Sequence, residues 1–90
     1  MRTPVRSGQF KRDVKRAEKR GCDMRKLRAV LTLLLEERPL PTGLRDHPLK
    51  GAWKGYRDLH IEPDWLLIYR IGGSELLLAR TGTHSDIFEE

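Results

Sequence analysis

The 90-residue sequence predicts an α+β domain, in which a short N-terminal strand and a helical hairpin pack on one face of a small antiparallel sheet. Apolar residues recur at helical spacing through residues 8–38, and apolar runs separated by turn residues follow in residues 56–80. Helices followed by a block of strands are typical of α+β folds. A chain of this length has room for one core, so we expect a single domain over residues 1–90.

Residues 2–6 are expected to form a short edge strand, because Pro4 cannot donate a ladder hydrogen bond and is tolerated at a sheet edge. A helix should follow, with Ser7 as its N-cap and Gly21 as its stop. Its apolar positions recur at helical spacing and are Phe10, Val14 and Ala17.

A second helix is predicted from Asp23, which can cap it, to a point before Pro39. Its apolar stripe consists of Met24, Leu27, Val30, Leu31, Leu34 and Leu35. The turn between the two helices is short, so they should form a hairpin. Residues 39–48 contain three prolines and a glycine, so we expect an irregular connection there. An irregular connection of this length is uncommon in small domains unless it serves a site.

Three strands are predicted after this connection, joined by a turn at residues 62–64 and by a Gly-Gly hairpin. They are residues 56–61, 65–71 and 75–80, and residues 85–90 are expected to add one helical turn. In the first strand, alternation places Leu59 and Ile61 on the core face and Tyr56, Asp58 and His60 on the other. The second is almost continuously apolar, which is typical of a central strand covered on both faces.

The composition limits the classes of function. With 18 Lys and Arg against 13 Asp and Glu, the net charge of +5 favours a polyanionic partner, although a plain basic surface explains it about as well. Cys22 is the only cysteine, which excludes an intramolecular disulfide and a cysteine-based zinc site. The sequence contains neither a signal peptide nor a membrane-spanning run, so we expect a soluble cytoplasmic protein without a membrane partner.

All three histidines lie in the second half of the chain, at His47, His60 and His84. The predicted hairpin should hold His60 close to Asp64, and the other two histidines should approach the same end of the sheet. Imidazole titrates near neutrality, so converging histidines suit a reaction that needs both a base and an acid. One histidine alone is more often structural, but three together favour catalysis.

Cleavage of RNA is such a reaction, because a 2′-hydroxyl must lose a proton, a charged transition state must be stabilised and a 5′-oxygen must gain a proton. Arg80 is expected to contact the phosphate, unless it is a surface arginine paired with Glu75 or another carboxylate. Phe88 is expected to stack on a base, or alternatively to hold the C-terminus down. The aromatic residues expected to pack in the core or at its rim are Trp53, Tyr56, Trp65 and Tyr69.

Two alternatives stay open at this point. One is a non-catalytic basic module that binds nucleic acid and needs no histidine. The other is a metal-dependent hydrolase, although the spacing of its possible ligands matches no common zinc motif, so we expect no metal and no cofactor. Those possible ligands are His47, His60, Asp64 and His84.

The segment from Asp46 to Trp65, followed by residues 67–69 and 80–84, resembles the YafQ branch of the RelE-like (RelE/ParE) bacterial toxins. Residues 7–9 and 23–27 are similar to the same branch, so the resemblance spans nearly the whole chain. It implies a RelE-like fold and a toxin of a type II toxin-antitoxin system. That toxin would be a ribosome-dependent mRNA endoribonuclease (an mRNA interferase) that cuts codons in the A site, inhibits translation and is silenced by a DinJ-like, DNA-binding antitoxin.

The resemblance also implies a set of site residues. His84 would be the general acid, His60 and Asp64 the base and its orienting partner, and His47 would position the substrate or stabilise charge. Arg80 would contact the phosphate and Phe88 a base as accessory residues. Residues expected to dock on ribosomal RNA, or to receive an acidic antitoxin segment, are Lys11, Arg12, Lys15, Arg16, Lys19 and Arg20.

Overall fold

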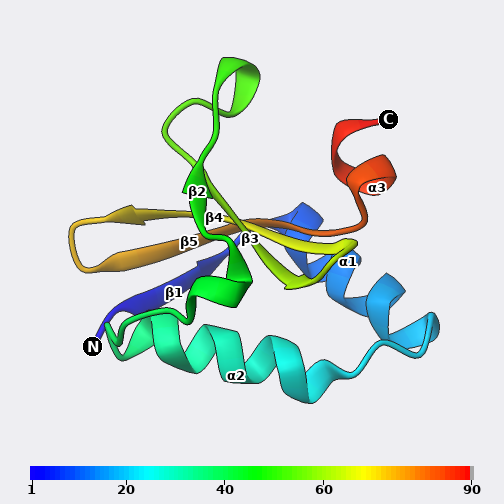
Figure 1. Ribbon diagram of the computed structural model, residues 1–90, viewed down its shortest axis with the longest axis horizontal. Helices are drawn as coiled ribbons and strands as arrows, with labels where there is room; N and C mark the ends of the chain where they lie inside the picture. The colour runs from blue at the N-terminus through cyan, green and yellow to red at the C-terminus, as the bar shows by residue number, and fades with distance from the viewer. Residues whose placement is uncertain (90) are drawn as a thin grey trace.

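The computed structural model describes residues 1–89, and its helices and strands form two layers (Figure 1). Helices α1 (Gly8–Lys19) and α2 (Met24–Leu35) cover one face of a five-stranded sheet, whereas α3 (His84–Phe88) lies on the other side. The strands are β1 (Thr3–Arg6), β2 (His47–Pro48), β3 (Arg57–Glu62), β4 (Trp65–Gly72) and β5 (Glu75–Gly82). Their order in the sheet is β1-β5-β4-β3-β2. No helix in residues 1–89 has the length and apolar character needed to cross a membrane.

The predicted helix boundaries are confirmed by their capping hydrogen bonds. The Ser7 hydroxyl accepts from the backbone N–H of Phe10 at 2.9 Å, and the Asp23 carboxylate accepts from that of Arg25 at 3.1 Å. Gly21 follows the first helix with a φ of 79°, a conformation that favours glycine. The predicted final turn is the helix α3, and only residue 90 of that prediction lies outside the described residues.

The core lies on both faces of the central strand β4, as its continuous apolar sequence predicts. Trp65, Leu67 and Tyr69 pack with the α1 and α2 side chains, while Leu66 and Ile68 pack with the segments on the opposite face. That opposite face is therefore partly apolar, and α3 and the loop before β3 cover it. The polar site is left at the β2–β3 side of the sheet and at the C-terminal end of β5.

Two features of the sheet were not predicted. The strand β1 pairs in parallel with β5, so the sheet is mixed, although all its other pairs are antiparallel as expected. The strand β2 lies within the segment predicted to be irregular and pairs His47 with Asp58. A strand of two residues is too short to show a strand periodicity, and the partner of His47 lies eleven positions along the chain.

The irregular segment is fastened to the sheet immediately before His47. The Asp46 carboxylate accepts hydrogen bonds from Arg57, through Nε at 3.2 Å and Nη2 at 3.0 Å, and from the hydroxyl of Tyr69. Burial and the hydrogen bond to Asp46 raise the pKa of Tyr69, so its phenol remains a protonated donor. These contacts set the position at which His47 enters β2.

Candidate active site

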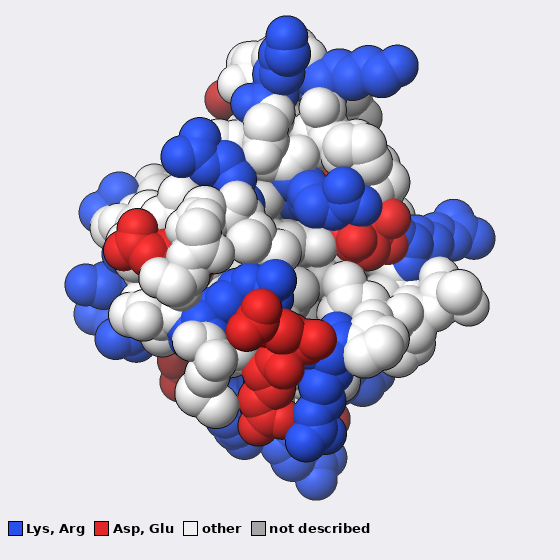
Figure 2. Space-filling model, turned by 90° about the vertical axis from the view of Figure 1, so that its left-hand side faces the viewer, with Lys and Arg blue, Asp and Glu red and all other residues white. Residues whose placement is uncertain are grey.

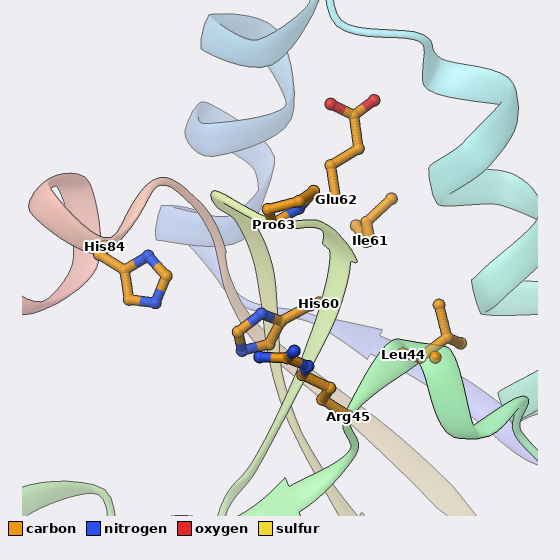
Figure 3. A pocket seen from close by; sticks show the side chains of 8 residues that line it. Leu44, Arg45, His60, Ile61, Glu62, Pro63 and His84 are labelled. Atoms are coloured by element: carbon orange, nitrogen blue, oxygen red, sulfur yellow. The ribbon is translucent and has the colours of Figure 1, made fainter.

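The three histidines converge in a row, although they come from three different elements. His47 lies on β2, His60 on β3 and His84 at the start of α3. The centroids of the His47 and His60 rings are 6.1 Å apart, and those of His60 and His84 are 5.7 Å apart. His60 and His84 line one hollow, toward which they reach from opposite sides (Figure 3). An arrangement of this kind can hold one phosphate group within reach of several proton donors and acceptors.

Asp64 is bound to His84 and not to His60, which corrects the predicted pairing. Its Oδ1 accepts from the backbone N–H of His84 at 2.9 Å and lies 2.6 Å from the imidazole Nδ1. These two hydrogen bonds, the backbone one first, lower the pKa of Asp64. An ionised carboxylate only accepts, so Nδ1 carries a proton and Nε2 is left for a substrate. The ladder shifts register between His60 and Glu62, so spacing along the hairpin does not give the side-chain directions.

Asp58 belongs to the site but was not among the predicted catalytic residues. Its Oδ2 lies 3.7 Å from Nε2 of His47 and 3.9 Å from Nε2 of His60. Its side chain is buried, and Oδ1 has no hydrogen-bond partner in the described part of the chain. Burial raises the pKa of Asp58, and the charges of His60 and His47 oppose this shift. Strand alternation did place Asp58 on the His60 face, but only the β2 pairing shows that His47 joins them.

Among residues 1–89, the same three side chains form the group that could hold a metal ion. His47, Asp58 and His60 each offer a ligand atom, and these atoms lie within 4.8 Å of one another. The Nδ1 of His47 lies 2.7 Å from the carbonyl oxygen of Arg45 and donates to it, which leaves Nε2 with its lone pair. This set differs from the predicted ligands, because Asp58 takes the place of Asp64 and His84.

Arg80 is paired with a buried carboxylate. Its Nε donates to Asp13 Oδ2 at 2.7 Å, and its Nη2 donates to Oδ1 at 3.3 Å and to the carbonyl oxygen of Asp86 at 3.3 Å. The geometry matches the alternative in which Arg80 pairs with a carboxylate, but the partner is Asp13 and not Glu75. The two residues are 67 positions apart in the chain, so no local pattern reveals the pair. A direct contact between Arg80 and phosphate stays a prediction.

The backbone at His84 is fixed by the start of α3. Thr83 and Asp86 form a capping box, in which each side chain accepts from the other's backbone N–H. Gly82 has a φ of 156°, and a Cβ there would lie 2.9 Å from Asp86 Oδ2, so a glycine is required. The hydrogen bond from Arg20 at 2.6 Å is the main cause that holds the pKa of Asp86 well below its usual range.

These ion pairs reduce the number of free cations on α1. Arg20 and Arg16 both face Asp86, and Arg16 also donates to Asp13 at 2.9 Å. The exposed lysines among the predicted docking residues are Lys11, Lys15 and Lys19. Figure 2 shows basic side chains at the top, in the middle and along the rim of one face, interspersed with acidic side chains. On that face the positive charge does not form one continuous patch.

The aromatic residues pack as predicted. Trp65 and Tyr69 are buried in the core, and the rings of Trp53 and Tyr56 meet edge to face at 5.3 Å on the opposite side of the sheet. Phe88 is half-buried against the cluster around Ile68, and its ring centroid is 6.5 Å from that of His84. Both predicted roles of Phe88 are compatible with this position.

Comparison with known proteins identifies the family of this chain. The family described as "Bacterial toxin of type II toxin-antitoxin system, YafQ" matches residues 2–89. The mRNA interferase toxin YafQ of Escherichia coli K12 is 54% identical over 83 residues, which cover 91% of this chain and 90% of that protein. The crystal structure of the E. coli DinJ-YafQ complex has a TM-score of 0.91 at 52% identity, covering 98% of this chain and 99% of that one. A metal-bound toxin from Helicobacter pylori also has a TM-score of 0.91, at 41% identity, covering 98% and 100%. The chain belongs to the YafQ family of toxins of type II toxin-antitoxin systems.

Proposed function

We propose that this protein is an endoribonuclease that cuts mRNA codons in the ribosomal A site and thereby inhibits translation. The observation that carries the proposal is the row of three imidazoles with the Asp64 carboxylate bound to the last of them. The E. coli relative named as an mRNA interferase supports the same reaction class. The chemistry needs proton transfer and charge stabilisation, and side chains supply both without a metal.

In the proposed reaction, the 2′-oxygen forms a bond to phosphorus and the bond from phosphorus to the 5′-oxygen breaks. His60 takes the proton of the 2′-hydroxyl, and Nε2 of His84 gives its proton to the departing 5′-oxygen. Asp64 holds Nδ1 of His84, so it orients the ring and stabilises the imidazolium before transfer. The products are a 2′,3′-cyclic phosphate and a free 5′-hydroxyl.

His47 is proposed to act as an imidazolium, with a proton on each ring nitrogen, whose Nε2–H donates to the phosphate and stabilises the negative charge that develops there. Its Nδ1 is held by the carbonyl oxygen of Arg45, so only Nε2 is presented to the substrate. The buried Asp58 lies near Nε2 of both His47 and His60, and its carboxylate is proposed to pair with either ring when that ring is charged. Neighbouring groups of this kind exchange protons as a unit, so the base is the His60–Asp58–His47 group and not one isolated side chain.

The accessory roles concern substrate placement. Phe88 is proposed to stack on a base next to the cleaved bond, because its ring borders His84. Arg80 is proposed to act mainly by holding β5 to α1 and to the Asp86 carbonyl oxygen. The exposed basic residues of α1 are proposed to dock on ribosomal RNA; they are Lys11, Arg12, Lys15 and Lys19.

The proposed partners follow from the family. The E. coli relative was crystallised in complex with DinJ, and we infer that a cognate antitoxin of the same kind silences this chain. Ribosome and mRNA are the other proposed partners, and the cytoplasm is therefore the proposed location of the protein.

A metal-dependent hydrolase is the second candidate, because His47, Asp58 and His60 form a donor set. The metal-bound H. pylori relative supports this alternative. In this chain the three donors coincide with the proposed base, so an ion bound there would occupy the nitrogen that accepts the proton. We therefore favour the metal-free reaction. A cleavage assay in the presence of a chelator distinguishes the metal-free reaction from the metal-dependent one.

Expression of the wild type and of His84→Ala in an inducible bacterial host tests the proposal. Mapping the 5′ ends of cellular mRNA after induction should show in-frame cuts with the wild type only, while both proteins bind the antitoxin equally. Full cleavage by His84→Ala would refute the assigned acid. If neither protein produces new cuts and RNA binding falls steeply with salt, the non-catalytic binding module is correct.

A further inference from the structure

The proposed reaction needs a fixed cation at the phosphate, and the predicted cation is already engaged. The guanidinium of Arg80 forms a two-point pair with Asp13, whose side chain is fully buried. Arg57, close to the site in the sheet, is likewise paired with Asp46. A guanidinium whose donors are already bound to a carboxylate offers little charge or geometry to a phosphate.

Arg45 is the arginine that points into the site without such a partner. Its side chain is exposed and makes no hydrogen bond or ion pair with any residue in 1–89. It lines, with His60 and His84, a hollow of ≈ 520 Å³, a volume in the range of small-ligand sites. Figure 3 shows the Arg45 guanidinium beside the His60 ring, with His84 facing them across the hollow. A phosphate between the two imidazoles would therefore meet this guanidinium.

The backbone of Arg45 provides a second, independent observation. Its φ of 53° and ψ of 40° are left-handed, a conformation that is costly for a residue with a side chain. Its carbonyl oxygen accepts the hydrogen bond from Nδ1 of His47 at 2.7 Å. The strained residue therefore orients one histidine through its backbone while its side chain enters the hollow beside another. Backbone strain of this kind clusters at ligand-binding and catalytic positions.

We propose that Arg45 is a catalytic residue that binds the non-bridging oxygens of the scissile phosphate through its guanidinium and stabilises the charge of the transition state. The inference rests on the proposed function and adds to it a guanidinium that, unlike that of Arg80, is not bound to a carboxylate of residues 1–89. Arg45 transfers no proton, because guanidinium stays charged at all physiological pH values. Its effect should therefore fall on the rate of the chemical step and leave the pH profile unchanged.

The test compares Arg45→Gln with Arg45→Lys and with the control Arg6→Gln. Glutamine removes the charge but has the same left-handed backbone cost as arginine, so the thermal midpoint should stay that of the wild type. Lysine keeps the charge without the two-pronged geometry. Arg6 is an exposed arginine on β1, the edge strand opposite β2. Cleavage is measured as the single-turnover rate on mRNA in programmed ribosomes at saturating protein, together with ribosome affinity.

Arg45→Gln should lower the saturated rate about 100-fold at every pH, with ribosome affinity changed by less than about tenfold. Arg45→Lys should recover part of the loss, and Arg6→Gln should cleave like the wild type. A wild-type rate for Arg45→Gln, or a loss confined to affinity, would overturn the inference.

A second readout does not depend on cleavage. The Nε–H signal of Arg45 in the wild type should shift in NMR spectra when a trinucleotide RNA with a 2′-O-methyl group is added. An unmoved signal refutes the Arg45 contact. If the signal moves but the wild type cuts no mRNA, the contact stands and the proposed reaction fails.

Discussion

Asp64 holds His84 by two hydrogen bonds to one oxygen, one from the backbone N–H at 2.9 Å and one from the imidazole Nδ1 at 2.6 Å. The first fixes the start of α3 relative to the turn between β3 and β4. The second fixes the tautomer and orientation of the ring. Because the Asp64 side chain is 64% exposed, a change of its charge should act on the chemistry more than on the stability of the domain.

Asp64→Asn tests this relationship. The amide keeps the shape of the carboxylate but removes the charge that stabilises the imidazolium, so the cleavage rate should fall about 10- to 100-fold. The measurement is single-turnover cleavage of ribosome-bound mRNA. Glu62→Gln is the matched control, because Glu62 ends β3 just before the turn that holds Asp64 and pairs with Lys26 instead of His84. Equal losses in the two variants would show that general charge near the hollow, and not the Asp64 contact, controls the rate.

Asp58→Asn should make the protein more stable at neutral pH while lowering its cleavage rate about tenfold. Burial raises the pKa of Asp58 in the folded state, so stability falls as the pH rises above 3.8, where the unfolded chain ionises first, and the loss is complete above the raised pKa. Below the ordinary value of 3.8 the carboxyl is protonated in both the folded and the unfolded protein, and this effect is absent. Thermal unfolding should therefore show a midpoint gain of a few degrees at pH 7 and a smaller one at pH 4. A loss of stability at pH 7 would contradict this reading of Asp58.

Asp13→Ala should destabilise the fold by about 3–5 kcal/mol, because it leaves the Arg80 guanidinium partly buried without its partner. The Asp13 carboxylate also accepts from the backbone N–H of Thr81 at 3.1 Å and from the Gln9 side chain at 2.9 Å. Urea unfolding measures the change. Lys26→Ala, which breaks the exposed pair with Glu62, should cost less than about 1 kcal/mol. Similar costs for both variants would mean that burial does not strengthen the Asp13 pair.

Chelation should leave cleavage intact. In the proposed reaction His47, Asp58 and His60 handle protons, so removing divalent transition metals with a chelator should not lower the rate, provided that the Mg²⁺ the ribosome needs is restored. The assay compares programmed ribosomes with and without dialysis of the toxin against the chelator. Loss of cleavage that returns with added Zn²⁺ or Cu²⁺ would instead support the metal-dependent alternative.

Local signals in the sequence determined most of the secondary structure. The caps Ser7 and Asp23 bond to N–H groups two or three residues away, so their effect is visible in a short window. The continuous apolar run of β4 predicted a strand buried on both faces. The convergence of His47, His60 and His84 was predicted from their residue type and from their places at one end of the predicted sheet.

Tertiary structure alone decided which of these side chains act on one another. Asp64 meets His84 across 20 residues, Asp13 meets Arg80 across 67, and Asp58 meets His47 through a two-residue strand. Such pairs depend on strand register and on where a helix end is placed, because one step along a strand turns a side chain to the other face. Residue types in the sequence therefore indicated the chemistry. The tertiary structure determined that Asp58 lies in the site, that Arg80 pairs with Asp13, and that the Arg45 side chain lies in the hollow without a partner in residues 1–89.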